Sequence, residues 1–114
     1  MSIVNSKTGK TRKSYSASEL ILSANYMRGL DLVSLNCAGS GHSGGTLSIM
    51  DITAALYLRV ANHDPQNPDW DGRDRIIWSV GHKAPALYLG LGMSGYYPAE
   101  DLVFLRKFNS PFQG

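Results

Sequence analysis

Apolar residues recur every three or four positions near the start of the chain, which is the spacing of one face of an α-helix. They are Leu20, Ala24, Met27 and Leu35. This stripe predicts a helix over about 18–36. Ser16 and Glu19 stand before it with the spacing of a capping box, in which a hydroxyl and a carboxylate satisfy the first free N–H groups. Asp31 falls inside the stripe. Because a buried carboxylate needs a partner, we expect Asp31 near a cation, a helix N-terminus or an open interface.

A glycine-rich break and several shorter elements follow this helix. Four glycines between residues 38 and 45 disfavour any regular element there. The pattern after the break predicts helices over about 48–61, 84–93 and 99–107, with a loop rich in Asn, Asp and Pro over 62–74. Pro85 suits the first turn of the helix over 84–93.

One segment has the pattern of a β-strand. Residues 75–80, Arg-Ile-Ile-Trp-Ser-Val, are rich in β-branched and aromatic side chains, which is typical of a strand buried on both faces of a parallel sheet. A parallel strand needs hydrogen-bonding neighbours, and the pattern predicts no second strand. We therefore expect a mostly helical, incomplete α/β unit that either pairs with another chain or is the front part of a longer protein.

Composition narrows the class of protein. The chain has 114 residues, of which 43% are hydrophobic and 18% charged, as in ordinary globular domains. Its single cysteine cannot form an internal disulfide and no apolar run is long enough to span a membrane, so we expect a cytoplasmic protein without membrane partners. The basic start, residues 1–15, predicts a flexible polar terminus. A nucleic-acid arm is disfavoured because no second basic or aromatic cluster follows.

Three histidines are candidates for chemistry. His82 follows the predicted strand and precedes a predicted helix, where α/β sheets bind ligands and free N–H groups favour an anion such as a diphosphate. His42 lies among glycines that let a ligand approach the backbone, and imidazole exchanges protons near neutral pH. On these local features alone, each is as readily a capping or turn histidine. His63, at a helix end, is expected to be structural.

Four segments resemble, in order and spacing, the opening of transketolases. They read Gly39-Ser40-Gly41-His42-Ser43-Gly44-Gly45, Asn62-His63-Asp64-Pro65, Arg73-Asp74-Arg75 and Gly81-His82-Lys83-Ala84-Pro85. Each segment is weak alone, but the ordered set is specific and covers about residues 18–114. The chain is most similar to transketolases whose N-terminal half is a separate subunit.

The resemblance implies that residues 16–114 are the front part of a doubly wound α/β domain that binds the diphosphate of thiamine diphosphate. The implied reaction transfers a two-carbon ketol unit between sugar phosphates. His42 is similar to the family's histidine that contacts substrate near the reactive carbon, so it is the catalytic and substrate-binding candidate. His82 is similar to the histidine that touches the cofactor diphosphate. Gly45, Gly81 and Ala84 stand at further cofactor-binding positions.

The chain departs from the family pattern at two positions and lacks other parts of the site. Ser43 stands where many members carry proline, which loosens the glycine-rich loop. Val80 stands where many members carry a lysine beside the diphosphate, which weakens cofactor contact unless Lys83 supplies the charge. The family's ligands for Mg²⁺ or a similar divalent cation correspond to positions beyond Gly114, so no metal ligand is predicted here. We expect this chain alone to be inactive. The implied partners are a C-terminal region or a separate C-terminal subunit, in a homodimer or heterotetramer.

Two other functions stay open at this point. One is a related thiamine-diphosphate enzyme, either 1-deoxyxylulose-5-phosphate synthase or a transketolase specialised for a sulfosugar or apulose phosphate. The other is a non-catalytic assembly module in which the same residues serve only subunit contacts. The segments at 41–45 and 81–85 favour transketolase proper.

Overall fold

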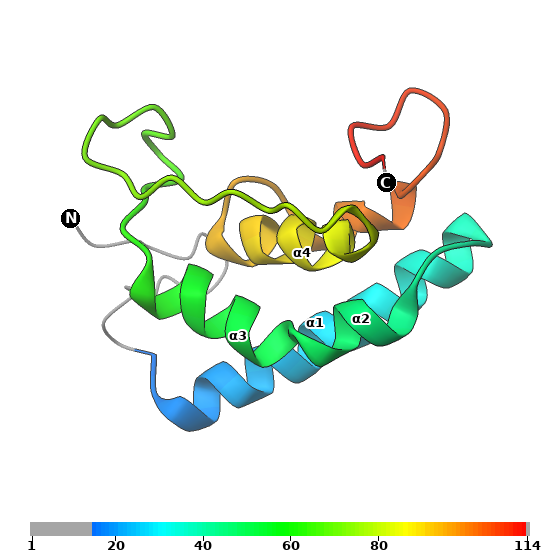
Figure 1. The fold of residues 1–114 in the computed structure, drawn as a ribbon, viewed down its shortest axis with the longest axis horizontal. Helices are drawn as coiled ribbons and strands as arrows, with labels where there is room; N and C mark the ends of the chain where they lie inside the picture. The colour runs from blue at the N-terminus through cyan, green and yellow to red at the C-terminus, as the bar shows by residue number, and fades with distance from the viewer. Residues whose placement is uncertain (1–14, 114) are drawn as a thin grey trace.

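The computed structural model describes residues 15–113, and its regular elements there are all helical (Figure 1). In chain order they are α1 (Ala17–Ala38), α2 (Ser43–Ser48), α3 (Met50–Ala55), the π-helical turn η2 (Leu56–Val60), the 3₁₀ turn η3 (Gly81–Lys83), α4 (Ala84–Ser94) and the 3₁₀ helix η4 (Ala99–Phe104). The long helix α1 packs against α3 and η4, while α4 packs against η4 and η2. Helices α1, α2 and α3 lie together on one side of α4 (Figure 1).

The first helix forms as the sequence predicts. Ser16 is its N-cap, and the Oγ atom accepts a hydrogen bond of 3.2 Å from the backbone N–H of Glu19. At the other end Gly39 adopts a left-handed φ of 71°, and its N–H donates to the carbonyl of Leu35 at 2.9 Å. Both ends therefore have their free backbone groups satisfied by local residues.

The core forms where the apolar stripe of α1 meets the other helices. Its fully buried members are Ala24, Met27, Met50, Ala54, Leu58, Ala86, Leu89, Ala99, Leu102 and Leu105. Leu20 and Leu35 of the predicted stripe pack against this cluster and are partly buried. Burial of one such Leu or Met side chain contributes about 1.5–3 kcal/mol to folding, so this core is the main source of stability.

Within residues 15–113, Asp31 has neither the cation nor the helix N-terminus that the sequence offers as partners, and an open interface stays the remaining prediction. Its side chain lies on the buried face of α1 and is 0% exposed, yet neither carboxylate oxygen has a hydrogen-bond partner among the described residues. Burial raises the pKa of Asp31 from 3.8 to about 6, because removing a carboxylate from water disfavours its charged form. The neutral acid is thus favoured well above the pH at which an exposed aspartate ionises.

The second predicted helix is wrong at its start and is divided. Helix begins at Ser43, inside the glycine-rich stretch, and breaks at Ile49, whose φ of −103° and ψ of 6° leave the helical region. The expected cap at Ser48 is absent, since its hydroxyl donates to the carbonyl of Gly45 at 2.8 Å. Two six-residue helices, α2 and α3, result. Helices this short are marginal without tertiary contacts.

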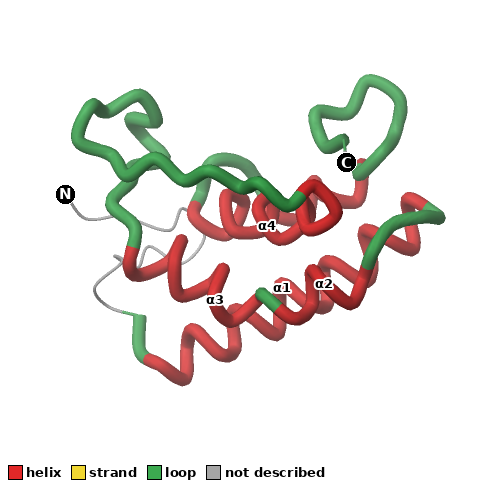
Figure 2. Tube along the Cα trace, in the orientation of Figure 1, coloured by secondary structure: helices red, strands yellow, loops and turns green. Residues whose placement is uncertain are grey.

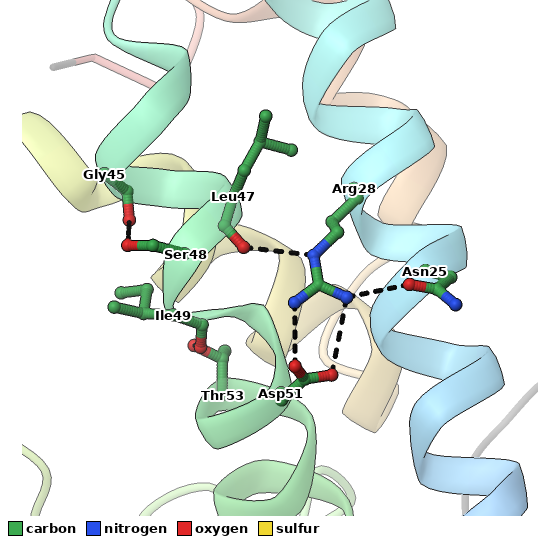
Figure 3. Close-up of polar contacts among 8 residues, drawn as sticks. All are labelled: Asn25, Arg28, Gly45, Leu47, Ser48, Ile49, Asp51 and Thr53. Atoms are coloured by element: carbon green, nitrogen blue, oxygen red, sulfur yellow. Dashed lines mark hydrogen bonds and ion pairs between the residues drawn. The ribbon is translucent and has the colours of Figure 1, made fainter.

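Arg28 supplies such a contact from α1 (Figure 3). Its Nε donates to the carbonyl of Leu47 at 3.0 Å, and its two terminal nitrogens reach both carboxylate oxygens of Asp51 at 2.9 and 3.4 Å. A further bond of 2.7 Å to Asn25 orients the guanidinium. One planar side chain therefore joins α1 to the end of α2 and the start of α3.

The strand predicted over 75–80 is not formed among the described residues, where no strand is present (Figure 2). The chain there is extended, as at Val80 with φ of −107° and ψ of 94°, and Ile77 is 85% exposed. A strand exists only with a neighbour to share its ladder of hydrogen bonds, and residues 15–113 provide none. The doubly wound sheet is thus not seen over residues 15–113.

The last predicted helix, over 99–107, is shorter and tighter than expected. η4 is a 3₁₀ helix that ends at Phe104, after which Leu105 has an extended ψ of 128° and Arg106 a left-handed φ of 61°. A left-handed residue cannot continue a right-handed helix. The N–H of Arg106 donates to the carbonyl of Phe112 at 2.7 Å, which closes a loop over residues 106–112.

The predicted flexible terminus, residues 1–15, falls almost wholly outside the described residues. Its last member, Tyr15, is described and is only 5% exposed. Across the described part of the chain, no helix combines the length and apolar character needed to cross a membrane.

Asp31 generates a prediction about pH. Because its pKa is raised to about 6 in the folded chain, the folded state is most favoured when Asp31 is protonated. The free energy of unfolding should fall by about 2–2.5 kcal/mol as pH rises from 4 to 7, since each pKa unit corresponds to about 1.4 kcal/mol and part of the change already lies below pH 4. Asp31→Asn should remove this component. Urea unfolding of both proteins at several pH values measures it, and parallel curves for the two proteins would contradict the assignment.

Arg28 generates a prediction about stability. Arg28→Lys keeps the charge but loses the planar fork, so we expect it to lower the free energy of unfolding by about 1–2 kcal/mol. Asp51→Asn, at a carboxylate whose side chain is 64% exposed, should cost less than about 1 kcal/mol. Thermal unfolding of both variants beside wild type measures the difference. Equal losses would mean that the ion pair, and not the bond to the Leu47 carbonyl, holds the helices together.

Candidate functional site

The glycine-rich segment turns sharply between α1 and α2 and exposes His42. Gly41 has φ of 136°, and a Cβ added there would lie 2.3 Å from Cδ2 of Leu35. Only glycine fits this backbone and this close packing. His42 is the N-cap residue of α2 but makes no side-chain cap bond, so its imidazole is directed elsewhere.

His82 lies beside His42 in the structure, although the two residues are distant in sequence. It lies in η3, directly before α4, and the indole N–H of Trp78 donates to the carbonyl of Lys83 at 3.2 Å to hold this turn. The ring centroids of His42 and His82 are 5.8 Å apart, with planes inclined by 63°. The structure thus brings together two histidines that the sequence predicts for two different roles.

A small hollow lies beside these two imidazoles. Its lining residues are Leu35, Gly41, His42, Gly81, His82, Pro85, Leu105 and Arg106. Its volume of about 20 Å³ has room for roughly one water molecule. The lining residues come from four parts of the chain, which are the end of α1, the glycine-rich segment, the start of α4 and the C-terminal loop.

The other predicted cofactor residues surround the start of α4. Gly81 and Ala84 flank His82 and Lys83 in the turn and first position of the helix. A Cβ added at Gly45 would lie 2.9 Å from Cε of Lys83, so the lysine side chain crosses over Gly45. All four predicted cofactor-binding residues therefore lie around this turn, with Gly45 brought in from α2.

Charge at this end of the molecule favours an anion. The N-cap residue of the 11-residue helix α4 makes no side-chain cap bond, so the first N–H groups of the helix have no partner from that residue. The ammonium of Lys83 belongs to the same turn, and the guanidinium of Arg106 lines the hollow. Helix N–H groups, a cation and imidazole donors are the groups that bind phosphate oxygens.

Arg106 was not predicted as a site residue. Its Nη1 donates to Oγ of Ser40 at 2.7 Å, although the two residues are 66 apart in sequence. The pattern over 99–107 predicts a helix, which conceals the left-handed turn that directs this side chain to the site. No local signal in the sequence identifies such a long-range contact.

His63 has the structural role that its position predicts. It is 5% exposed, and its Nε2 lies 2.8 Å from the carbonyl of Tyr57 while Nδ1 lies 2.7 Å from the hydroxyl of Tyr96. Because a carbonyl only accepts, Nε2 carries the proton and caps a carbonyl of η2. His63 belongs to neither the hollow nor the turn before α4.

A divalent cation finds no suitable donors in this part of the protein. Within residues 15–113, no three His, Cys, Asp or Glu side chains gather as a metal site. No carboxylate is among the residues that line the hollow beside the two histidines, whereas Mg²⁺ requires oxygen ligands. The residues present fit the diphosphate of the cofactor and do not fit its metal ion.

Comparison with known proteins identifies the family. The family model described as "Transketolase, thiamine diphosphate binding domain" matches residues 20–114. The chain is 48% identical over 84 residues to the 6-deoxy-6-sulfo-D-fructose transketolase subunit SqwG of Clostridium sp. strain MSTE9, which covers 74% of this chain and 30% of that subunit. It is 40% identical over 92 residues to transketolase 1 of Aliivibrio fischeri and 37% identical over 92 residues to that of Escherichia coli.

These alignments also define how much of a transketolase is present. The two transketolase alignments each cover 80% of this chain and 14% of the relative. The chain therefore spans less than a third of the length of the curated relatives it matches. A family match over residues 20–114, together with the glycine-rich and His82 segments that meet at one site, shows that this chain belongs to the transketolase family, in its thiamine-diphosphate-binding domain.

Proposed function

We propose that this chain is the diphosphate-binding front part of a transketolase that transfers a two-carbon ketol unit between sugar phosphates. The observation that carries the proposal is the approach of His42 to His82, 5.8 Å between ring centroids, at the start of α4. In this arrangement one imidazole serves the substrate and the other serves the cofactor. The two groups must be neighbours if the reacting carbon of the sugar is to meet the cofactor.

The proposed cofactor site is the turn before α4. His82 donates to a diphosphate oxygen, and Gly81 and Ala84 allow the diphosphate to lie against the backbone at the helix N-terminus. Lys83, which crosses Gly45, takes the place of the lysine that Val80 replaces. When bound, thiamine diphosphate supplies the nucleophilic carbon that takes up the two-carbon unit.

His42 is proposed to act on the substrate. Its imidazole is exposed beside the hollow, and its backbone carbonyl accepts a hydrogen bond of 3.3 Å from Oγ1 of Thr46, which holds the residue at the start of α2. An imidazole so placed can accept and return the proton of a sugar hydroxyl near neutral pH.

The proposal extends to the metal ion and to the partner chains of the complete enzyme. The Mg²⁺ or similar cation would be bound by other residues of the complete protein, since the described residues do not fit it. We propose a cytoplasmic homodimer or heterotetramer with a C-terminal region or subunit. The relative from Clostridium, which is itself named a subunit, supports the divided form.

We further propose that residues 75–80 become a strand of a doubly wound sheet in the complete protein. The chain there is already extended, and the side chain of Ile77 is 85% exposed. Two open grooves of about 500 and 230 Å³ adjoin the segment. The first is lined by Ile76, Leu87 and Leu91 together with charged residues such as Arg73, and the second by Ile49 and Ile52. Neighbouring strands would cover these grooves and satisfy the backbone.

A sulfosugar transketolase is the second candidate. The observation that favours it is 48% identity to a subunit named for 6-deoxy-6-sulfo-D-fructose. A sulfonate and a phosphate are both anions, so the site near His42 does not separate the two donors. The ratio of kcat/KM for the sulfonated and phosphorylated sugars, measured with the complete enzyme, discriminates between them.

The two histidines generate a prediction in the complete enzyme. His82→Ala should raise the thiamine diphosphate concentration needed for half activity, because a lost donor to a charged group costs about 1.5–3 kcal/mol, and saturating cofactor should restore most of the rate. His42→Ala should instead leave that concentration unchanged and lower kcat/KM about 100-fold. Steady-state kinetics measures both. A His42→Ala enzyme with the rate of wild type and only a lower Tm would make His42 a turn histidine.

Lys83 generates a second prediction. Lys83→Met keeps the aliphatic stem over Gly45 but loses the charge, so the Kd for thiamine diphosphate should rise about 10-fold, or about 1.4 kcal/mol. Val80→Lys in the same protein should recover most of this loss, because it returns the lysine at the position that many relatives use. Calorimetric titration of the complete enzyme measures both variants. A Kd that Lys83→Met leaves unaltered would show that the charge lies outside the cofactor site.

A further inference from the structure

Arg106 links the C-terminal loop to the glycine-rich segment that carries His42. The guanidinium donates to Oγ of Ser40 at 2.7 Å, and Arg106 is one of the residues that line the hollow beside His42 and His82. Ser40 is two residues from His42, so a contact at Ser40 acts on the backbone that places the imidazole.

The base of the Arg106 side chain is held in place. The backbone N–H donates to the carbonyl of Phe112 at 2.7 Å, and the preceding residue, Leu105, is 2% exposed in the core. The following residue, Lys107, donates from Nζ to the carbonyl of Cys37 at 2.6 Å. This last bond places a cation at the C-terminal end of α1, where the helix dipole favours it and where the last turn has no basic residue of its own. Arg106 therefore extends from a fixed point.

The glycine-rich segment needs such a restraint. Gly39 and Gly41 have φ of 71° and 136°, and glycine pays the largest conformational entropy of any residue when its backbone is fixed. The bonds from Thr46 to the carbonyl of His42 and from Ser48 to the carbonyl of Gly45 lie within the segment and α2. The bond from Arg106 comes from a different part of the fold and ties the segment to the core.

We propose that Arg106 is a positioning residue for His42, acting through Ser40, and that it does not contact the sugar itself. This proposal rests on the proposed function of His42. Arg106 fixes residues 39–42 so that the imidazole of His42 is held beside His82, where the reacting sugar would lie. A displacement of about 1 Å of a reacting group can cost up to about 100-fold in rate, so a modest loosening of this segment is enough to lower activity.

Kinetics of the complete enzyme tests the proposal with Arg106→Gln, Ser40→Ala and the double variant. Each single variant should lower kcat/KM for the sugar about 10-fold and leave the cofactor concentration for half activity unchanged. The double variant should be no worse than either single variant, because all three lack the same bond. Arg106→Lys, which can still donate to Ser40, should recover part of the activity.

Two kinetic results would overturn the proposal. If Ser40→Ala has the activity of wild type while Arg106→Gln is impaired, Arg106 acts through a contact other than the one with Ser40. If the two losses multiply in the double variant, the residues act independently, and the bond between them has no role in the reaction.

Hydrogen exchange of the amides in residues 39–45 separates failure of this proposal from failure of the proposed function. Arg106→Gln and Ser40→Ala should both speed this exchange in the complete protein, whatever the reaction is. If exchange in residues 39–45 is unchanged in both variants, the bond between Arg106 and Ser40 does not restrain the segment, and the proposal is wrong. If exchange is faster but kcat/KM is unaltered, the bond does restrain the segment, but the position of His42 does not matter for the reaction. In that case the proposed function of His42 fails.

Discussion

The arrangement of this chain depends on how α1 holds two helices that are too short to be stable alone. α2 and α3 have six residues each and are separated by a break at Ile49, so no continuous ladder of backbone hydrogen bonds joins them. The guanidinium of Arg28 bridges this break from α1, through the carbonyl of Leu47 and both oxygens of Asp51 (Figure 3). Because α2 carries Gly45 and begins beside His42, this contact also determines where the candidate site is built.

The site is assembled at one end of the molecule from segments that are distant in sequence. His42 follows α1, His82 precedes α4, and the C-terminal loop returns Arg106 to the same hollow. Lys83 crosses Gly45 and adds a positive charge near the N-terminus of α4. The imidazoles, the positive charges and the helix N-terminus at this end of the molecule are groups that bind an anion. This agrees with the family match to a thiamine-diphosphate-binding domain.

Two features of residues 15–113 lack the partners that a hydrogen-bonding group normally has. The segment over 75–80 is extended and apolar but has no neighbouring strand among residues 15–113. Asp31 is 0% exposed with both carboxylate oxygens unpartnered among the described residues, and burial raises its pKa to about 6. A hydrogen-bonding edge without a partner and a carboxylate without a donor are both costly in a finished fold.

Local rules in the sequence determined the parts of the structure that depend on neighbouring residues. The cap at Ser16, the left-handed end of α1 at Gly39 and the start of α4 near Pro85 follow from hydrogen bonds and backbone preferences within a few residues. The ordered glycine and histidine motifs likewise identified the family. The tertiary structure alone decided the break at Ile49, the left-handed turn at Arg106, the absence of a strand over 75–80 and the approach of Lys83 to Gly45. Each of these depends on groups far apart in sequence, or on a neighbouring strand that the described residues do not include, and no periodicity along one segment carries that information.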